Sequence, residues 1–177
     1  MSIQVASKAS TSIAIEFDLE DIVTQYGQPI LAYCHGILRN YHDAQDAVQI
    51  TFIKAHTKKG YYRENISLSA WLYRIAYNTC IDITRKRWLG LYDWQKEPAV
   101  EDSYQMEESY MSDSLSAALS DLPAKDRALV FNRVVDGMEY SELAEIYKAS
   151  EATLRKRYER AKKKLVMLLE AEKRKGS

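Results

Sequence analysis

Apolar residues recur at every third or fourth position through the first half of the chain, which is the spacing of helices with one buried face. A first helix is predicted from about Asp18 to Leu38. Gly27 and Pro29 are expected to bend or interrupt this helix. Residues 1–15 lack firm periodicity, and we expect them to form a mobile tail.

The next predicted helix carries two stripes of side chains. Asp43 is expected to cap its N-terminus. The stripe expected to be buried consists of Ala44, Val48, Phe52 and Ala55. A second stripe consists of Asp46, Gln49, Ile50 and Ile53. Because a solitary solvated helix does not need the two isoleucines of this second stripe, the pattern predicts that a partner covers it.

A third helix is predicted to begin at Ser67 or Ser69 and to end in a run of three bases, a charge that suits a helix C-terminus. The loop before it and its exposed flank combine aromatic, basic and amide side chains. These are Tyr61, Tyr62, Arg63, Tyr73, Arg74, Tyr77 and Asn78. Single tyrosines often cover half-buried surfaces without any partner. Their joint placement, however, indicates a surface on which unstacked bases of a single strand can stack.

Basic and acidic residues balance over the whole chain, but they are sorted into blocks. Residues 88–121 hold eight acids and one base, a net charge of −7. Residues 150–175 hold ten bases and four acids, a net charge of +6. The acidic block repels DNA, and its aperiodic part, residues 88–112, is predicted to be a flexible linker. The basic block attracts phosphate.

The basic block begins inside a pattern typical of a helix-turn-helix motif. Ser141 is expected to cap a short helix, Lys148 and Ala149 to form the turn, and Ser150 to cap a second helix. The second helix is expected to bury Leu154, Tyr158, Ala161 and Leu165. Its outward side chains, placed to contact a DNA groove, are Arg155, Lys156, Glu159, Arg160 and Lys163.

Composition narrows the class of protein. Only 6 glycines and 3 prolines occur in 177 residues, which favours an all-α fold of one domain or two small ones. No glycine-rich phosphate loop, nucleophile elbow or HExxH pattern is present, so we predict no enzyme, no catalytic residue and no cofactor. Cys34 and Cys80, even with His35 and His42, lack the spacing of a metal site. Because no apolar run resembles a signal peptide or a membrane span, a cytoplasmic protein without direct membrane insertion is expected.

Two segments resemble the extracytoplasmic-function (ECF) group of RNA polymerase sigma factors. The first is DAQDAVQITFIKAH at Asp43–His56, followed by LSAWLYRIAYNTCIDITRKR at Leu68–Arg87. The second is LPAKDRALVFNRVVDGMEYSELAEIYKASEATLRKRYERAKKKL at Leu122–Leu165. The pair, in this order and across an acidic linker, is more specific than either half alone.

The resemblance implies an all-α protein of two small helical domains joined by the flexible acidic linker 88–112. Region two would span 16–87, and region four, the helix-turn-helix, would span 113–177. It implies an alternative sigma factor that binds the clamp of the polymerase core's largest subunit and directs initiation at −35 and −10 promoter elements. An anti-sigma factor is a further implied partner.

The resemblance also implies roles for individual residues, by position. Contacts to the polymerase core fall on Asp46, Gln49, Ile50 and Ile53. Contacts to the −10 element fall on Tyr61, Tyr62, Arg63, Asn65, Arg74, Tyr77 and Asn78. Contacts to the −35 element fall on Arg155, Lys156, Arg157, Glu159, Arg160 and Lys163.

Some positions depart from the family pattern. Ile50 stands where an acidic residue is frequent, and His56 stands where an aromatic residue is frequent. Lys148 replaces the usual glycine of the turn, and a left-handed backbone there would cost lysine about 1 kcal/mol. Glu159 cannot bind phosphate, so we expect it to read a cytosine amine or to hold a neighbouring arginine. The alternative interpretation is a stand-alone helix-turn-helix regulator, which would bind promoter DNA without polymerase.

Overall fold

The computed structural model describes residues 17–63, 65–91 and 113–176, and the regular elements of these parts are all helices. They are α1 (Leu19–Leu38), α2 (Tyr41–Thr57), the short 3-10 helix η1 (Lys59–Tyr61), α3 (Leu68–Trp88), α4 (Asp113–Ser120), α5 (Ala124–Val134), α6 (Tyr140–Tyr147) and α7 (Glu151–Lys175). The all-α prediction is therefore confirmed. The predicted tail and most of the predicted linker lie outside the described residues.

Two of the predicted helix starts and the extent of the first helix agree with the structure. Ser67 caps α3 and Ser150 caps α7, each accepting a hydrogen bond from the backbone amide three residues later, at 3.1 and 3.2 Å. α1 runs without interruption through Gly27 and Pro29, so the interruption expected there is wrong. The two serine caps thus set where α3 and α7 begin.

Two other predicted caps are wrong. Asn40 caps α2 by accepting a hydrogen bond from the amide of Asp43 at 3.0 Å, so α2 begins earlier than predicted. The carboxylate of Asp43 instead forms an ion pair with Arg87 at the far end of α3. α6 is capped by Glu139 in a reciprocal capping box with the glutamate three residues later, which leaves Ser141 inside the helix.

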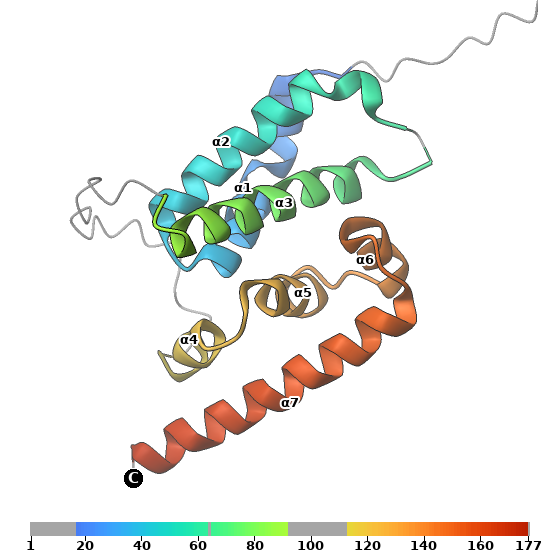
Figure 1. The fold of residues 1–177 in the computed structure, drawn as a ribbon. Coiled ribbons are helices and arrows are strands. Elements are labelled where there is room, and N and C mark those ends of the chain that lie inside the picture. Colours follow the sequence, from blue (N-terminus) through green and yellow to red (C-terminus); the bar gives the residue numbers. More distant parts are fainter. Residues whose placement is uncertain (1–16, 64, 92–112, 177) are drawn as a thin grey trace, which may run out of the picture.

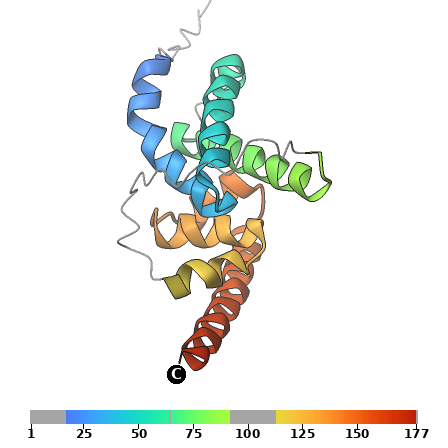
Figure 2. The ribbon, with the colours of Figure 1, turned by 90° about the vertical axis from the view of Figure 1, so that its left-hand side faces the viewer.

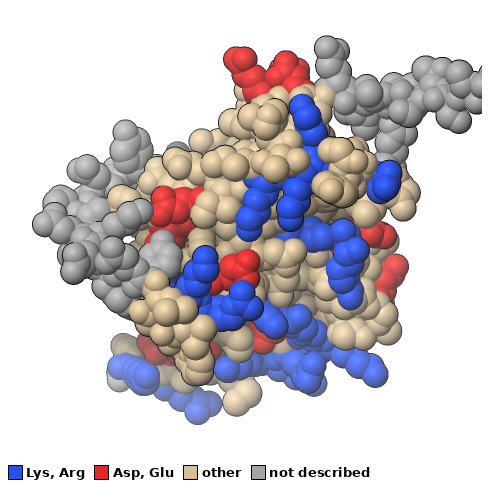
Figure 3. All heavy atoms as spheres, turned by 45° about the horizontal axis from the view of Figure 1, so that its top comes forward, with Lys and Arg blue, Asp and Glu red and all other residues tan. Residues whose placement is uncertain are grey.

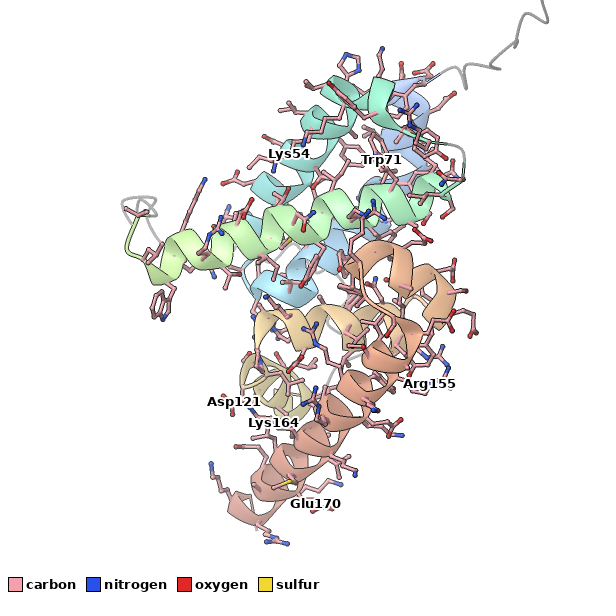
Figure 4. The ribbon with its side chains drawn as sticks, turned by 45° about the vertical axis from the view of Figure 1, so that its right-hand side comes forward. Lys54, Trp71, Asp121, Arg155, Lys164 and Glu170 are labelled. Atoms are coloured by element: carbon pink, nitrogen blue, oxygen red, sulfur yellow. The ribbon has the colours of Figure 1, made fainter. Side chains whose placement is uncertain are left out.

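Helices α1, α2 and α3 form an N-terminal bundle (Figure 1). Fully buried side chains at its centre include Ile30, Tyr33, Ile37 and Leu72. Trp71, labelled in Figure 4, lies near the start of α3. Its ring centre lies 6.1 Å from that of Phe17 and 5.2 Å from that of Tyr62. The loop before α3 is thereby anchored to the bundle.

Helices α4 to α7 form a C-terminal bundle in which the long α7 packs on α4, α5 and α6. Lys148 separates α6 from α7 with φ 52° and ψ 44°, the left-handed conformation expected of the helix-turn-helix turn. Leu154 and Ala161 of α7 are buried, as predicted. The remaining length of α7 extends away from the N-terminal bundle (Figure 1).

The two bundles lie directly against each other. α1 packs on α5, and α3 packs on α6 (Figures 1 and 2). Buried apolar residues of both bundles belong to one continuous cluster, which includes Tyr33 and Leu72 as well as Leu129, Leu143 and Ile146. The patterns in the sequence did not predict this packing, because they record only which face of each helix is apolar.

Candidate nucleic-acid interface

The first half of α7 carries an exposed basic surface. Five of the predicted −35 side chains line one shallow hollow on this helix: Arg155, Lys156, Glu159, Arg160 and Lys163. All five are exposed, and four of them are cations. Figure 3 shows Lys and Arg side chains gathered along the lower edge of the molecule, where α7 lies, and Figure 4 places Arg155 near the start of that helix. We call these five residues the α7 basic surface.

A tyrosine that the sequence analysis missed holds one member of this surface. The guanidinium carbon of Arg155 lies 4.7 Å from the ring centre of Tyr140, at the start of α6. The guanidinium carbon of Arg133, from α5, lies 5.1 Å from the same ring centre. Arg133 also donates a hydrogen bond to the carbonyl of Met138 at 3.0 Å. Cation–π contacts of this kind restrict the conformations open to a long side chain.

Arg157, the sixth predicted −35 residue, is separated from the other five. Its Nε donates to the carboxylate of Asp126 on α5 at 2.9 Å, and both side chains are about three-quarters buried. Burial raises the pKa of the Tyr77 phenol, and the positive charge of Arg157, together with its hydrogen bond, offsets part of that shift. Arg157 therefore connects α7 to the interior of the protein.

The loop before α3 presents part of the predicted −10 surface to solvent. Tyr61 is 78% exposed, and Arg63 and Asn65 are also exposed. Tyr62 is half-buried against Trp71 and donates a hydrogen bond to the carbonyl of Ile66 at 2.8 Å. Tyr62 thus stabilises the loop that carries the exposed side chains. Asn78, on α3, is exposed as well.

The remaining −10 candidates lie between the two bundles. The Arg74 side chain is only 15% exposed and donates from Nε to the carbonyl of Glu145 on α6 at 2.8 Å. The ring of Tyr77 packs edge-on against Tyr147, with 4.8 Å between ring centres. Tyr73, which the sequence analysis placed on the exposed flank of α3, is buried. That placement is wrong because the C-terminal bundle covers this face of the helix.

The stripe predicted to contact polymerase lies on the outer face of α2. Ile53 is 65% exposed, Ile50 and Gln49 are exposed, and Asp46 is half-buried. Two solvent-facing isoleucines on one helix face form an apolar surface that is available to a partner.

Metal-binding clusters and membrane-spanning helices are absent from the described residues. Nowhere among residues 17–63, 65–91 and 113–176 do three or more His, Cys, Asp or Glu side chains gather as a metal ion would require. Cys34 and Cys80 are both buried thiols. No helix in the part of the chain that the structure describes is long and apolar enough to cross a membrane.

Comparison with known proteins agrees with this geometry. Residues 22–89 match sigma-70 region 2, and residues 112–165 match sigma-70 region 4. The ECF RNA polymerase sigma factor SigW of Bacillus subtilis is 30% identical over 159 residues, which cover 82% of this chain and 85% of that protein. The chain belongs to the ECF sigma factor family. The region 2 match includes the loop before α3 and the outer face of α2 of this sigma factor. The region 4 match includes its α7 basic surface.

Two solved structures share the fold. The sigma factor RpoE of Bartonella quintana, in complex with the anti-sigma factor NepR, aligns with a TM-score of 0.67 and 24% identity, over 86% of this chain and 97% of that one. CnrH, in complex with the cytosolic domain of CnrY, aligns with a TM-score of 0.63 and 21% identity, over 86% of this chain and 88% of that one. Both alignments extend across the two bundles of this sigma factor.

Proposed function

We propose that this ECF sigma factor recognises promoters through two separate surfaces and binds the polymerase core through a third. The α7 basic surface reads the −35 element, the loop before α3 holds −10 bases, and the outer face of α2 docks on the clamp of the polymerase core. The chain itself catalyses no reaction in this scheme. The observation that carries the proposal is that five predicted −35 side chains, four of them cations, lie exposed together on one face of the capped helix α7.

Binding at −35 is supported by the shape and charge of α7. An α-helix fits the major groove of duplex DNA, where arginine can bond to guanine through two hydrogen bonds. Lys156 and Arg160 are four residues apart and so share one face. Arg155 is held by Tyr140 before any DNA arrives, which lowers the conformational entropy lost on binding. Glu159 lies in the same hollow, between cations, where it can accept from a cytosine amine or orient a neighbouring arginine.

Binding at −10 is supported by the exposed part of the loop. Tyr61 offers a ring on which an unstacked base can lie, and Arg63, Asn65 and Asn78 offer donors and acceptors for base edges or phosphate. Extruding a base from the duplex costs a few kcal/mol. Stacking and edge contacts in the loop would offset that cost.

Docking on polymerase is supported by the exposed isoleucines of α2, since burying them removes apolar surface from water.

An anti-sigma factor is a further proposed partner. One solved sigma factor with the same fold, RpoE of Bartonella quintana, was captured in complex with the anti-sigma factor NepR.

Transcription with purified polymerase core tests this function. The chain and the core together should initiate at specific promoters among genomic fragments, whereas either alone should not. In the same assay, Arg160→Ala should reduce output by weakening −35 recognition. Arg174→Ala, an exposed arginine in the last turn of the same helix, is the matched control and should leave output unchanged. Promoter-specific output that does not depend on the added chain would contradict the proposal.

A further inference from the structure

Lys148, between α6 and α7, holds a left-handed backbone conformation, with φ 52° and ψ 44°. In this conformation the Cβ atom of an L-residue lies too close to the following carbonyl oxygen, which raises the free energy of the folded chain. Glycine has no Cβ atom and adopts the same conformation without this steric cost. The turn therefore carries a lysine at a position where glycine would make the fold more stable.

The side chain of Lys148 does not offset this cost by a contact within the fold. It is exposed, and it forms no hydrogen bond or ion pair with the residues that the structure describes. Glu145, one helical turn earlier in α6, lies instead 3.6 Å from the guanidinium of Arg74. The ammonium group of Lys148 therefore remains available to an anion from outside the chain.

Arg39 provides a comparison within the same molecule. It is the only other residue besides glycine that has a positive φ in the described parts of the chain, at 56°. Its backbone amide closes the end of α1 by donating to the carbonyl of His35 at 2.8 Å. Its guanidinium donates to the hydroxyl of Ser116 on α4. The Arg39 side chain thus joins two helices, whereas the equally strained Lys148 has no such internal contact.

Lys148 lies beside the end of α7 where the basic surface begins. Ser150 caps α7 two residues later, and Figure 4 places Arg155 near the start of that helix. A recognition helix contacts base edges with its N-terminal residues, so side chains beside that end lie near the phosphates that border the groove. Glu151, in the first turn of α7, would repel those phosphates. A lysine three residues earlier offsets this negative charge.

We propose that Lys148 binds a phosphate of the −35 duplex, at the edge of the groove that α7 enters. The ammonium group ends a flexible stem, so it can meet a phosphate without a fixed orientation and independently of the neighbouring base. This inference rests on the proposed function and adds a contact outside the recognition helix. Lysine at this turn thus lowers the stability of the free chain and raises its affinity for DNA.

Lys148→Gly tests the proposal because it should change stability and DNA affinity in opposite directions. Relief of the left-handed strain should raise the melting temperature of the free chain by about 2–4 °C. The complex with polymerase core should bind every −35 sequence more weakly by the same factor, about fivefold near physiological salt, and the slope of affinity against salt should fall by about one unit. A residue that served only to form the turn would change the melting temperature alone.

Three further variants separate charge from strain. Lys148→Asn removes the charge, and asparagine tolerates the left-handed conformation, so it should act like Lys148→Gly without the added backbone freedom of glycine. Lys148→Arg keeps both the charge and the strain and should retain the salt slope and the melting temperature of the wild type. Arg174→Ala removes an exposed cation from the last turn of α7 and should leave the salt slope unchanged.

A wild-type salt slope in the folded Lys148→Gly and Lys148→Asn variants would overturn the proposal. Weaker co-purification with polymerase core at an unchanged salt slope would also overturn it, because Lys148 would then contact polymerase. A melting temperature that rises in neither variant would show that the left-handed lysine carries no cost. Promoter-specific transcription by the wild-type chain with core tests the proposed function separately. If that transcription is observed while Lys148→Gly keeps the wild-type slope, only the phosphate contact is wrong.

Discussion

The hydroxyl groups of Tyr33 and Tyr147 lie 2.9 Å apart, although 114 residues separate them in the sequence. Tyr33 belongs to α1 and Tyr147 to α6, so this hydrogen bond joins the two bundles. Burial raises the pKa of both phenols well above 10, the ordinary value for tyrosine. The contact therefore couples the docking of the bundles to the protonation of buried side chains.

This coupling predicts how the docked arrangement responds to base. The pKa values of Tyr33, Tyr73, Tyr77 and Tyr147 are all raised, with burial as the largest cause. A raised pKa means that the neutral phenol is favoured in the folded chain. Its stabilisation is fully present below about pH 10 and is lost as the pH rises through the raised values. At about pH 11, the tyrosinate absorbance of the native chain should stay well below that of the denatured chain. Equal absorbance in the two states would contradict this prediction.

The contact between Tyr140 and Arg155 predicts that Tyr140 influences base discrimination at the −35 element. Tyr140→Leu removes the ring beneath the guanidinium, so Arg155 should discriminate less well among bases at one −35 position, by about 1 kcal/mol. Tyr140→Phe keeps the ring and should preserve discrimination. Transcription from a panel of −35 variants measures the ratio between the best and the substituted base. If Tyr140→Leu lowered output by the same factor on every promoter, the ring would support the fold without positioning Arg155.

The exposed face of α2 predicts a loss of polymerase binding. Ile53→Arg places a charge where an apolar contact with polymerase core is proposed, and co-purification with the core should fall at least tenfold. Because Ile53 is largely exposed, the free energy of unfolding should change by no more than about 0.5 kcal/mol. Gln45→Arg, another exposed position on α2, should bind the core like wild type. Full co-purification of a folded Ile53→Arg variant would remove this face from the proposed interface.

Lys163, at the C-terminal end of the α7 basic surface, is expected to make a purely electrostatic contact with DNA phosphate. Lys163→Ala should weaken binding to all promoter sequences alike and reduce the slope of affinity against salt by about one unit, as the loss of one phosphate contact would. Arg160→Ala should instead cost about 1–3 kcal/mol at one −35 position. Measuring −35 variants at two salt concentrations separates these effects. If Arg160→Ala weakened binding to all sequences equally, Arg155 and Lys156 would be the base-reading residues instead.

The sequence predicts the helices better than their assembly. Apolar spacing and the caps Ser67 and Ser150 locate α3 and α7, because these signals act within a few residues of each other. The cap of α2 was misassigned because the carboxylate of Asp43 is occupied by Arg87, 44 residues away, and no local pattern records that pairing.

In the candidate site, too, the sequence predicts local features better than contacts between distant segments. The α7 basic surface follows from helical periodicity, and it holds five of the six predicted −35 residues. Arg157 differs because Asp126 of α5 draws it inward. Arg74 and Tyr77 differ because α6 docks on their face of α3. Tyr73 differs because it packs against Tyr33 of α1 and bonds to Asp136. Aromatic and basic residues suit a protein interface as well as a nucleic acid, so composition alone cannot distinguish the two.

Footprinting on one promoter, with and without polymerase core, tests the central claim most directly. The account predicts that the free chain leaves the −10 region unprotected and that adding the core produces protection at −35 and −10 together, with −10 bases becoming reactive as single strands. Specific protection of both elements by the free chain alone would contradict the account. It would indicate a stand-alone regulator.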